Sequence, residues 1–157
     1  MRVGHGFDAH RLAAGRALWL GGVRIPSERG LAGHSDGDVL LHAVMSALFG
    51  ALGEGDLGTA FPSSDPAWKD VASGELLGRV VALLAARGLS IVNLDATVIA
   101  EQPRLGPFRG AMVESIAKLL DVPPERVNVK VTSTDGLGAI GRAEGIAAQA
   151  VVLLDGG

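Results

Sequence analysis

Hydrophobic residues alternate with smaller or polar ones at the start of the chain and again over residues 127–132. At the start, Val3, His5 and Phe7 follow this alternation, which predicts a strand that reaches Asp8. Segments rich in β-branched and other apolar residues indicate further strands at residues 17–20, 23–25, 89–100, 127–132 and 146–154. The last of these is apolar at almost every position, so it offers little polar alternation for a solvated face.

Apolar residues at helical spacing predict a helix over residues 36–52. Ser35, followed three residues later by Asp38, resembles a capping box and is expected to start this helix. His42 would then lie about two turns inside it, on the face that it shares with Asp38 and Ser46.

Two further helices are predicted over residues 74–87 and 107–120 by the same criterion. Ser73 is the expected N-cap of the first, and Gly88 its C-cap. Glycine, proline and polar residues predict loops at residues 27–33, 61–70, 101–106 and 133–145.

These elements indicate an α+β fold, with a mixed β-sheet covered by helices on one face. At 157 residues we expect one domain over residues 1–157, long enough to bury a real core. Small aliphatic side chains would build that core, since hydrophobic residues make up 48% of the chain and aromatic residues only 4%.

Charge and composition exclude several classes of function. The net charge of −3 argues against sequence-independent binding to nucleic acid, so no nucleic-acid partner is expected. No apolar run approaches the roughly 18 residues of a membrane span, and no signal-like segment opens the chain, so we expect a cytoplasmic protein without a membrane partner. The absence of cysteine excludes disulfides and thiolate metal sites.

Two short motifs match known signatures but lack the required context. Residues 33–37 match the G-x-S-x-G nucleophile elbow, yet no strand directly precedes them and the only later histidine is His42 in the same predicted helix. Residues 136–141 match G-x-G-x-x-G, yet a strand-like run follows where a dinucleotide-binding unit needs a helix. We interpret the second motif as a loop whose backbone amides can approach a phosphate.

Asp8, His10 and His42 form a better candidate site. Asp8 and His10 are two residues apart, so in a strand they point the same way, and the helix could add His42 as a third ligand. Two histidines and one carboxylate suit zinc and would leave a fourth position open. Because a lone helical histidine is more often structural than a ligand, spacing leaves both interpretations open. Thr132 and Ser133, near Asp135 at a strand end, suit either phosphate binding or an ordinary turn.

Several segments together resemble one known family over essentially the whole chain. The matching segments are Gly4–Arg11, Gly21–Pro26, His34–Val39, Gly55–Gly58, Phe61-Pro62, Asp65-Pro66, Asn128–Lys130 and Gly141–Gly145. On these motifs the chain resembles the 2-C-methyl-D-erythritol 2,4-cyclodiphosphate synthases of non-mevalonate isoprenoid (terpenoid) biosynthesis.

The resemblance implies a metal-dependent phosphorus–oxygen lyase. Its substrate, 4-diphosphocytidyl-2-C-methyl-D-erythritol 2-phosphate, would be cyclised by attack of the 2-phosphate on the β-phosphate, with release of CMP. Zn²⁺ or another divalent transition metal would bind at Asp8, His10 and His42, and Mg²⁺ or Mn²⁺ would bind the substrate diphosphate. A homotrimer around a sheet-lined axis is implied, with active sites between subunits.

The resemblance also assigns roles to individual residues. His34 and Ser133 match the catalytic positions that stabilise the transition state. The implied substrate-binding residues are Asp8, Ala9, His10, His34, Ser35, Asp56, Leu57, Gly58, Phe61, Pro62, Ser63, Ser64, Asp65, Ala100, Glu101, Gln102, Pro103, Arg104, Leu105, Gly106, Thr132, Ser133, Thr134, Asp135, Ala139 and Arg142. Three residues depart from the pattern: Asp135 replaces a common Glu, Ser133 a common Thr, and Ala139 a common aromatic.

Two other functions fit part of this pattern. A metal-dependent phosphohydrolase acting on a nucleotide diphosphate would use the same zinc ligands with water as nucleophile. A trimeric regulator that binds a nucleotide or isoprenoid would retain ligand affinity without turnover. Product analysis separates the first alternative from the cyclase, and turnover with zinc and magnesium separates the second.

Overall fold

A five-stranded sheet is the central element of the fold in the computed structural model, which describes residues 1–156. Its strand order is β4-β1-β7-β5-β6, and only β5 and β6 are parallel. The five strands are β1 (Arg2–Ala14), β4 (Arg29–Leu31), β5 (Ser90–Ile99), β6 (Val127–Thr132) and β7 (Gly145–Asp155). The predicted α+β fold with a mixed sheet is therefore confirmed.

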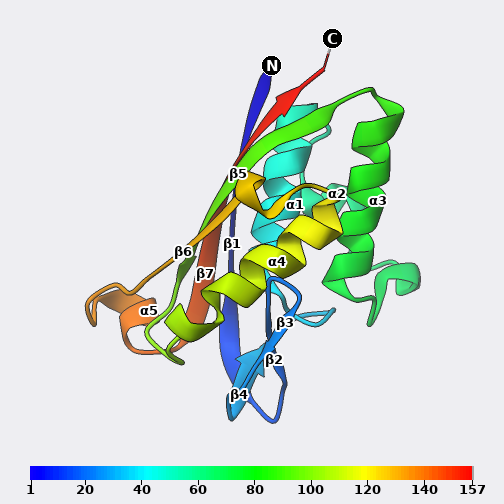
Figure 1. Cartoon of the computed structure of the whole chain (residues 1–157). Coiled ribbons are helices and arrows are strands. Elements are labelled where there is room, and N and C mark those ends of the chain that lie inside the picture. The colour runs from blue at the N-terminus through cyan, green and yellow to red at the C-terminus, as the bar shows by residue number, and fades with distance from the viewer. Residues whose placement is uncertain (157) are drawn as a thin grey trace.

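Helices cover one face of this sheet (Figure 1). They are α1 (Val39–Leu52), α2 (Leu57–Ala60), α3 (Ser73–Ala86) and α4 (Arg109–Leu120). The short α5 (Gly138–Gly141) lies apart from them, to the left of β7 in Figure 1. Single turns are η1 (Pro66–Trp68), η2 (Gly106–Phe108) and η3 (Pro124–Arg126). Helix α1 packs against β1 and β7, whereas α4 packs against β6 and α3. A two-stranded hairpin, β2 (Leu18–Leu20) and β3 (Val23–Ile25), lies beside the main sheet. None of the helices within residues 1–156 combines the length and apolar character that crossing a membrane requires.

Glycine at two positions of β1 brings α1 unusually close to the sheet. A Cβ atom at Gly4 would lie 1.9 Å from the Ala47 carbonyl oxygen, and one at Gly6 would lie 2.0 Å from the Ala43 carbonyl oxygen. Any larger side chain would therefore push the helix away. Since Ala43 follows His42 and Gly6 precedes Asp8 by two residues, this contact also fixes the distance between the two parts of the candidate site.

The predicted start of the first helix is wrong. Asp38, not Ser35, is the N-cap of α1: its buried carboxylate accepts hydrogen bonds from the backbone nitrogens of Leu41 (3.0 Å), Gly21 (2.9 Å) and Gly22 (2.7 Å). One side chain thus satisfies both the helix start and the hairpin turn, which outweighs the local capping pattern. His42 is consequently the fourth residue of α1 rather than two turns inside it.

Three smaller expectations also need correction. Residues 29–31 form β4 within the expected loop 27–33, because pairing with β1 supplies hydrogen bonds that local sequence does not reveal. Residues 138–141 form one helical turn within the expected loop 133–145. Ser73 is the first residue of α3 rather than its N-cap, and its fully buried hydroxyl makes contacts elsewhere.

Candidate metal centre and flanking cavities

Strand β1 directs Asp8 and His10 toward the covered side of the sheet, where α1 presents His42. The Asp8 Oδ2 atom lies 2.8 Å from His10 Nε2 and 3.0 Å from His42 Nδ1, and the two ring nitrogens are 3.2 Å apart. The three side chains are mostly but not completely buried, with 12–29% of each exposed. The structure therefore brings together all three residues of the predicted metal site.

The donor set fits a divalent metal ion. A tetrahedral ion with ligand bonds near 2.0–2.1 Å separates its ligand atoms by about 3.3 Å, close to the spacing of these three atoms. One carboxylate oxygen and two imidazole nitrogens are suitable donors for zinc and for other first-row divalent ions. Three protein ligands leave room for a further ligand on the exposed side.

Asp8 and His10 shift each other's protonation. Burial would raise the pKa of Asp8, but hydrogen bonds from His10 and His42 and the charges of both rings outweigh it and hold that pKa well below its usual range. The hydrogen bond to Asp8 raises the pKa of His10, although burial opposes this shift. The cluster thus contains an ionised carboxylate that is able to coordinate a cation.

Each histidine has a partner for the ring nitrogen that faces away from the cluster. His10 Nδ1 lies 2.6 Å from the Ala32 carbonyl oxygen, and His42 Nε2 lies 3.0 Å from the Ser73 hydroxyl. Sequence reasoning missed this role of Ser73, which is 31 residues from His42 and belongs to a different helix. No local spacing pattern could have found it, because the pairing depends on how α3 packs against α1.

A cavity of about 180 Å³ adjoins the candidate metal ligands His10 and His42. It brings together five of the predicted substrate residues other than the metal ligands, namely His34, Ser35, Leu57, Phe61 and Ser63. Trp68 and Lys69 also line it and were not predicted. The Phe61 and Trp68 rings meet edge to face with centroids 5.0 Å apart, which gives this cavity one firm apolar wall.

Five other predicted residues lie near this cavity in sequence but do not line it, namely Asp56, Gly58, Pro62, Ser64 and Asp65. Asp56 caps α2, and its hydrogen bonds at Thr59 lower its pKa. Asp65 caps the turn η1, where its carboxylate accepts a hydrogen bond from Ala67 N at 2.9 Å. Gly58 is in α2, and Ser64 immediately precedes Asp65.

A second cavity, of about 410 Å³, lies at the far edge of the sheet. The segment from Ala100 to Pro107 surrounds it together with Val131, Thr132 and Ser133, and only Gln102 of that segment is missing from its lining. The Glu101 Oε2 atom is buried and has no hydrogen-bond partner within residues 1–156. A buried acceptor normally receives a hydrogen bond, and a ligand could supply the donor here, so this loop is a candidate ligand site.

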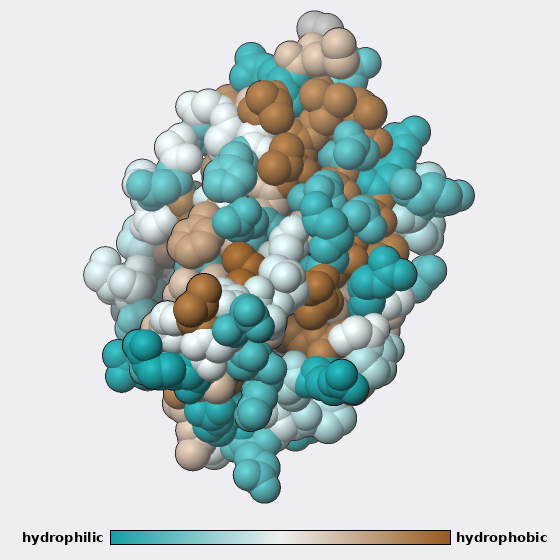
Figure 2. Space-filling view, turned by 90° about the vertical axis from the view of Figure 1, so that its left-hand side faces the viewer, coloured by the Kyte–Doolittle hydropathy of each residue, from teal (hydrophilic) through white to brown (hydrophobic). Residues whose placement is uncertain are grey.

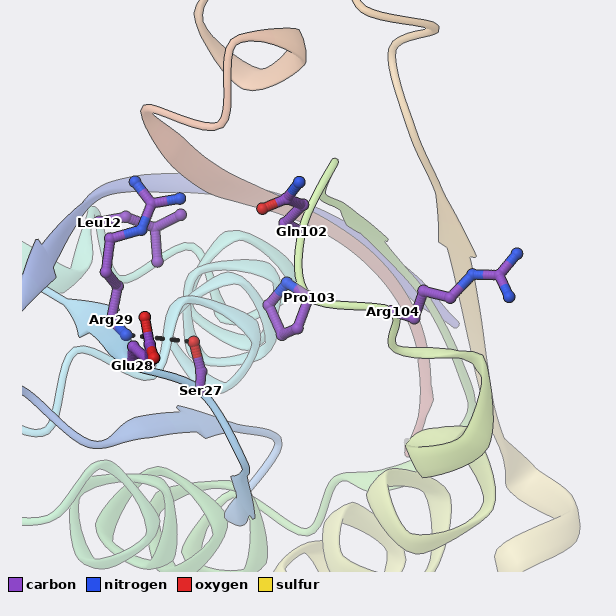
Figure 3. Close-up of a pocket in the computed structure, with 7 residues that line it drawn as sticks. All are labelled: Leu12, Ser27, Glu28, Arg29, Gln102, Pro103 and Arg104. Carbon is purple, nitrogen blue, oxygen red and sulfur yellow. Dashed lines mark hydrogen bonds between the residues drawn. The ribbon is translucent and has the colours of Figure 1, made fainter.

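Gln102 lies instead on the other side of the same loop (Figure 3). There it faces Arg29 across a third cavity, of about 400 Å³, which Pro103 and Arg104 also line. The Arg29 guanidinium donates a hydrogen bond to the Ala143 carbonyl oxygen at 3.0 Å, so this side chain is held in place. The loop over residues 100–106 therefore has two hollowed sides.

The structure does not unite all predicted substrate residues around one cavity. Ala9, Ala147, Ile99 and Thr132 are successive partners in one row across the sheet, so β1 and β6 are separated by about 14 Å. Ala9 and Thr132 are exposed on the uncovered face, opposite to the candidate metal ligands. Within one chain, the sheet separates the two halves of the predicted site.

Beyond Ser133, residues 134–142 line neither the cavity next to the candidate metal ligands nor the cavity at the loop over residues 100–106. Asp135 adopts a left-handed conformation with φ of 54°, and Thr134 donates a hydrogen bond to the Leu137 carbonyl oxygen at 2.7 Å. Ala139 lies in α5, and Arg142 forms an ion pair with Glu144 at 2.6 Å. None of these residues touches the metal cluster in the described chain.

Comparison with known proteins agrees with the geometry. Residues 1–155 match the model of the YgbB family. A 2-C-methyl-D-erythritol 2,4-cyclodiphosphate synthase from Symbiobacterium thermophilum is 56% identical over 156 residues, which cover 99% of each chain.

Solved structures of such enzymes share the fold. The structure of a 2-C-methyl-D-erythritol 2,4-cyclodiphosphate synthase with bound CDP superposes with a TM-score of 0.91 at 40% identity, covering 98% of this chain and all of the other. A CDP complex of IspF from Plasmodium falciparum superposes with a TM-score of 0.87 at 31% identity, covering 99% of this chain and 96% of the other. The chain belongs to the YgbB family, the family of the 2-C-methyl-D-erythritol 2,4-cyclodiphosphate synthases.

Proposed function

We propose that this chain, as a single catalytic domain of the cytoplasm, cyclises 4-diphosphocytidyl-2-C-methyl-D-erythritol 2-phosphate to 2-C-methyl-D-erythritol 2,4-cyclodiphosphate and releases CMP. The observation that carries the proposal is the cluster of Asp8, His10 and His42, which adjoins a cavity lined by His34 and Ser35. A chain of this family with that donor set intact has what metal-assisted phosphoryl transfer requires.

Zinc is the metal that we propose for the cluster, with Mg²⁺ or Mn²⁺ on the substrate diphosphate. Bound there, the metals would polarise the phosphoryl oxygens and neutralise the charge that develops during transfer. The role of Asp8, His10 and His42 is to hold the zinc with one side open to the substrate. No protein nucleophile is required, since the 2-phosphate of the substrate itself attacks.

His34 and Ser133 are the groups to which we assign stabilisation of the transition state. His34 lines the cavity next to the metal ligands, so it can donate a hydrogen bond to a phosphoryl oxygen there. Ser133 lies at the end of β6, beside the second cavity, where its hydroxyl can contact the diphosphate. Both residues would act on charge rather than by forming a bond to phosphorus.

The cytidine end of the substrate is proposed to bind at the loop over residues 100–106. Two of the similar solved structures are complexes with CDP, which supports a cytidine ligand for this chain. The cytosine amino group is a hydrogen-bond donor where uracil has an acceptor. Backbone carbonyls of the loop and the unpartnered Glu101 Oε2 atom are acceptors that can make this distinction.

We further propose a homotrimer in which each site combines the metal cluster of one chain with the cytidine loop of another. The separation of the two cavities within one chain supports it. The uncovered face of the sheet supports it as well, because Val3 (68%), Phe7 (55%) and Val151 (43%) are exposed there. Figure 2 shows hydrophobic side chains gathered between polar ones on this side of the molecule.

A metal-supplemented assay that identifies both products tests the proposal. With zinc and magnesium present, we expect equal amounts of CMP and a cyclic diphosphate, which phosphorus NMR distinguishes from an open-chain phosphate. CMP together with an open-chain product would instead indicate a phosphohydrolase. Binding of the substrate without turnover would indicate a regulator.

A further inference from the structure

Two polar or charged side chains within residues 1–156 are fully buried, Asp38 and Ser73. Asp38 is accounted for by its backbone hydrogen bonds at the start of α1. Ser73 has no capping role, although it is the first residue of α3. A buried hydroxyl needs hydrogen-bond partners, and those of Ser73 connect the metal cluster to a carboxylate.

The contacts of Ser73 form a directed chain. Its Oγ atom lies 3.0 Å from His42 Nε2 and 2.5 Å from Asp36 Oδ1, and its backbone nitrogen donates to Asp36 Oδ2 at 2.9 Å. A carboxylate can only accept, so the Ser73 hydroxyl donates its proton to Asp36. The Ser73 oxygen is then free to accept a hydrogen bond from the proton on His42 Nε2.

This direction decides which nitrogen of His42 is available to a metal ion. A neutral imidazole carries one proton, so a proton on Nε2 leaves a lone pair on Nδ1. The Nδ1 atom is the one that faces Asp8 Oδ2, at 3.0 Å, and His10 Nε2, at 3.2 Å. Ligating histidines generally donate their other N–H group to such a partner, which fixes ring orientation and tautomer.

We propose that Ser73 and Asp36 are positioning residues that hold His42 in its metal-binding orientation and tautomer. The inference rests on the metal site of the proposed function. It adds two residues that do not touch the metal themselves and act only through His42. Ser35 also has its hydroxyl near His42 Nε2, but at 3.4 Å it is the more distant partner.

Zinc affinity, measured by competition with a chromophoric chelator, is the primary test because it requires no turnover. We expect Ser73→Ala to weaken zinc binding about 10- to 100-fold, the range found when such a supporting partner is removed. Ser73→Thr keeps the hydroxyl and should stay within a few-fold of the wild-type affinity. Ser115→Ala removes a half-buried serine from α4, beside the same region, and serves as the matched control with unchanged affinity.

Asp36→Asn provides a second variant if Ser73→Ala folds poorly, which circular dichroism would reveal. It keeps the shape of the side chain but removes the charge, so we expect a smaller loss of zinc affinity than for Ser73→Ala. In the zinc-loaded protein, nitrogen-15 NMR should detect a proton on His42 Nε2. This proton should exchange faster with solvent in Ser73→Ala. If Ser73 only helped the chain to fold, its replacement would not change this exchange rate.

The outcomes separate this inference from the proposed function. If the wild type binds zinc and both Ser73→Ala and Asp36→Asn bind it with wild-type affinity, the role of Ser73 and Asp36 is overturned, whereas the proposed metal site stands. A larger loss in Ser35→Ala than in Ser73→Ala would also overturn it, by assigning the support to Ser35. A wild-type chain that binds no zinc would overturn the metal site and this inference with it.

Discussion

The two ends of the proposed active site differ in how far one chain completes them. At the metal end, three side chains from β1 and α1 lie within 3.2 Å of one another, and both histidines have partners for their outer nitrogens. At the cytidine end, a loop encloses a cavity in which the Glu101 Oε2 atom lacks a hydrogen-bond partner among the described residues.

This difference indicates that folding of one chain is enough to assemble the metal end but not the cytidine end. The metal end depends on close packing of α1 on Gly4 and Gly6, so it forms together with the core. The proposed cytidine end lies about three strand spacings away, roughly 14 Å, and in the proposed trimer a second chain would bring it to the metal end. Variants of the two ends should therefore fail in different ways.

Removal of a metal ligand should have the largest effect. We expect His42→Ala to lose zinc affinity by more than about 100-fold, beyond what loss of a supporting partner causes, and to lose activity with it. Elemental analysis and the CMP-release assay measure the two losses. His5→Ala is the control, since His5 is on the uncovered face of β1 and should keep its zinc. Stoichiometric zinc in His42→Ala would contradict the assignment.

Removal of a transition-state donor should separate catalysis from metal binding. His34→Ala and Ser133→Ala are each expected to keep zinc and to lower kcat by about 10²–10³-fold, with a small change in KM. The two residues belong to opposite ends of the proposed site, so similar effects would show that both ends meet in one transition state. Zinc loss in His34→Ala, or near-normal kcat in either variant, would rule out this role.

Loss of the buried N-cap Asp38 should lower the stability of the fold and with it the integrity of the metal end. Asp38→Asn keeps the size of the side chain, but its amide can no longer accept all three backbone hydrogen bonds. We expect the free energy of unfolding to fall by about 1–3 kcal/mol, as measured by urea denaturation. Burial raises the pKa of Asp38 because it disfavours the charged carboxylate. The neutral amide of the variant avoids this cost, which offsets part of the loss of stability. An unchanged midpoint would show that the hairpin and α1 are held by other contacts.

The smallest effect is expected for a side chain of the cytidine loop. Gln102→Ala should change CDP affinity less than a few-fold, because we assign cytosine specificity to other acceptors of the loop, whereas deletion of one loop residue should abolish binding. Calorimetry should also show weaker binding of UDP than of CDP. Equal affinities for CDP and UDP would contradict the assignment of this loop to cytosine.

Much of the metal end could be predicted from sequence because its signals are local. The strand period aligned Asp8 with His10, and helical spacing placed His42 on a neighbouring element. The capping pattern at Ser35 was misleading, since Asp38 makes bonds to Gly21 and Gly22 that only the folded hairpin supplies. The same limit applies to Ser73, whose role depends on a contact between two helices.

The cytidine end was less predictable for a related reason. The loop was expected at residues 101–106, but its two cavities depend on the approach of β6 on one side and of β4 on the other. Strand β4 itself is only three residues long and contains Gly30, so its propensity is weak and pairing with β1 decides its structure. Roles that resemblance to the family assigns to residues 132–142 remain predictions.

Complementation between two inactive variants tests most directly the claim that each site combines two chains. His42→Ala lacks the metal end and Ser133→Ala lacks a group of the cytidine end. Co-expressed and randomly mixed in a cyclic trimer, the two should regenerate intact sites at about a quarter of all positions, and CMP release should rise to a similar fraction of the wild-type rate. A mixture as inactive as the separate variants would show that both ends come from the same chain.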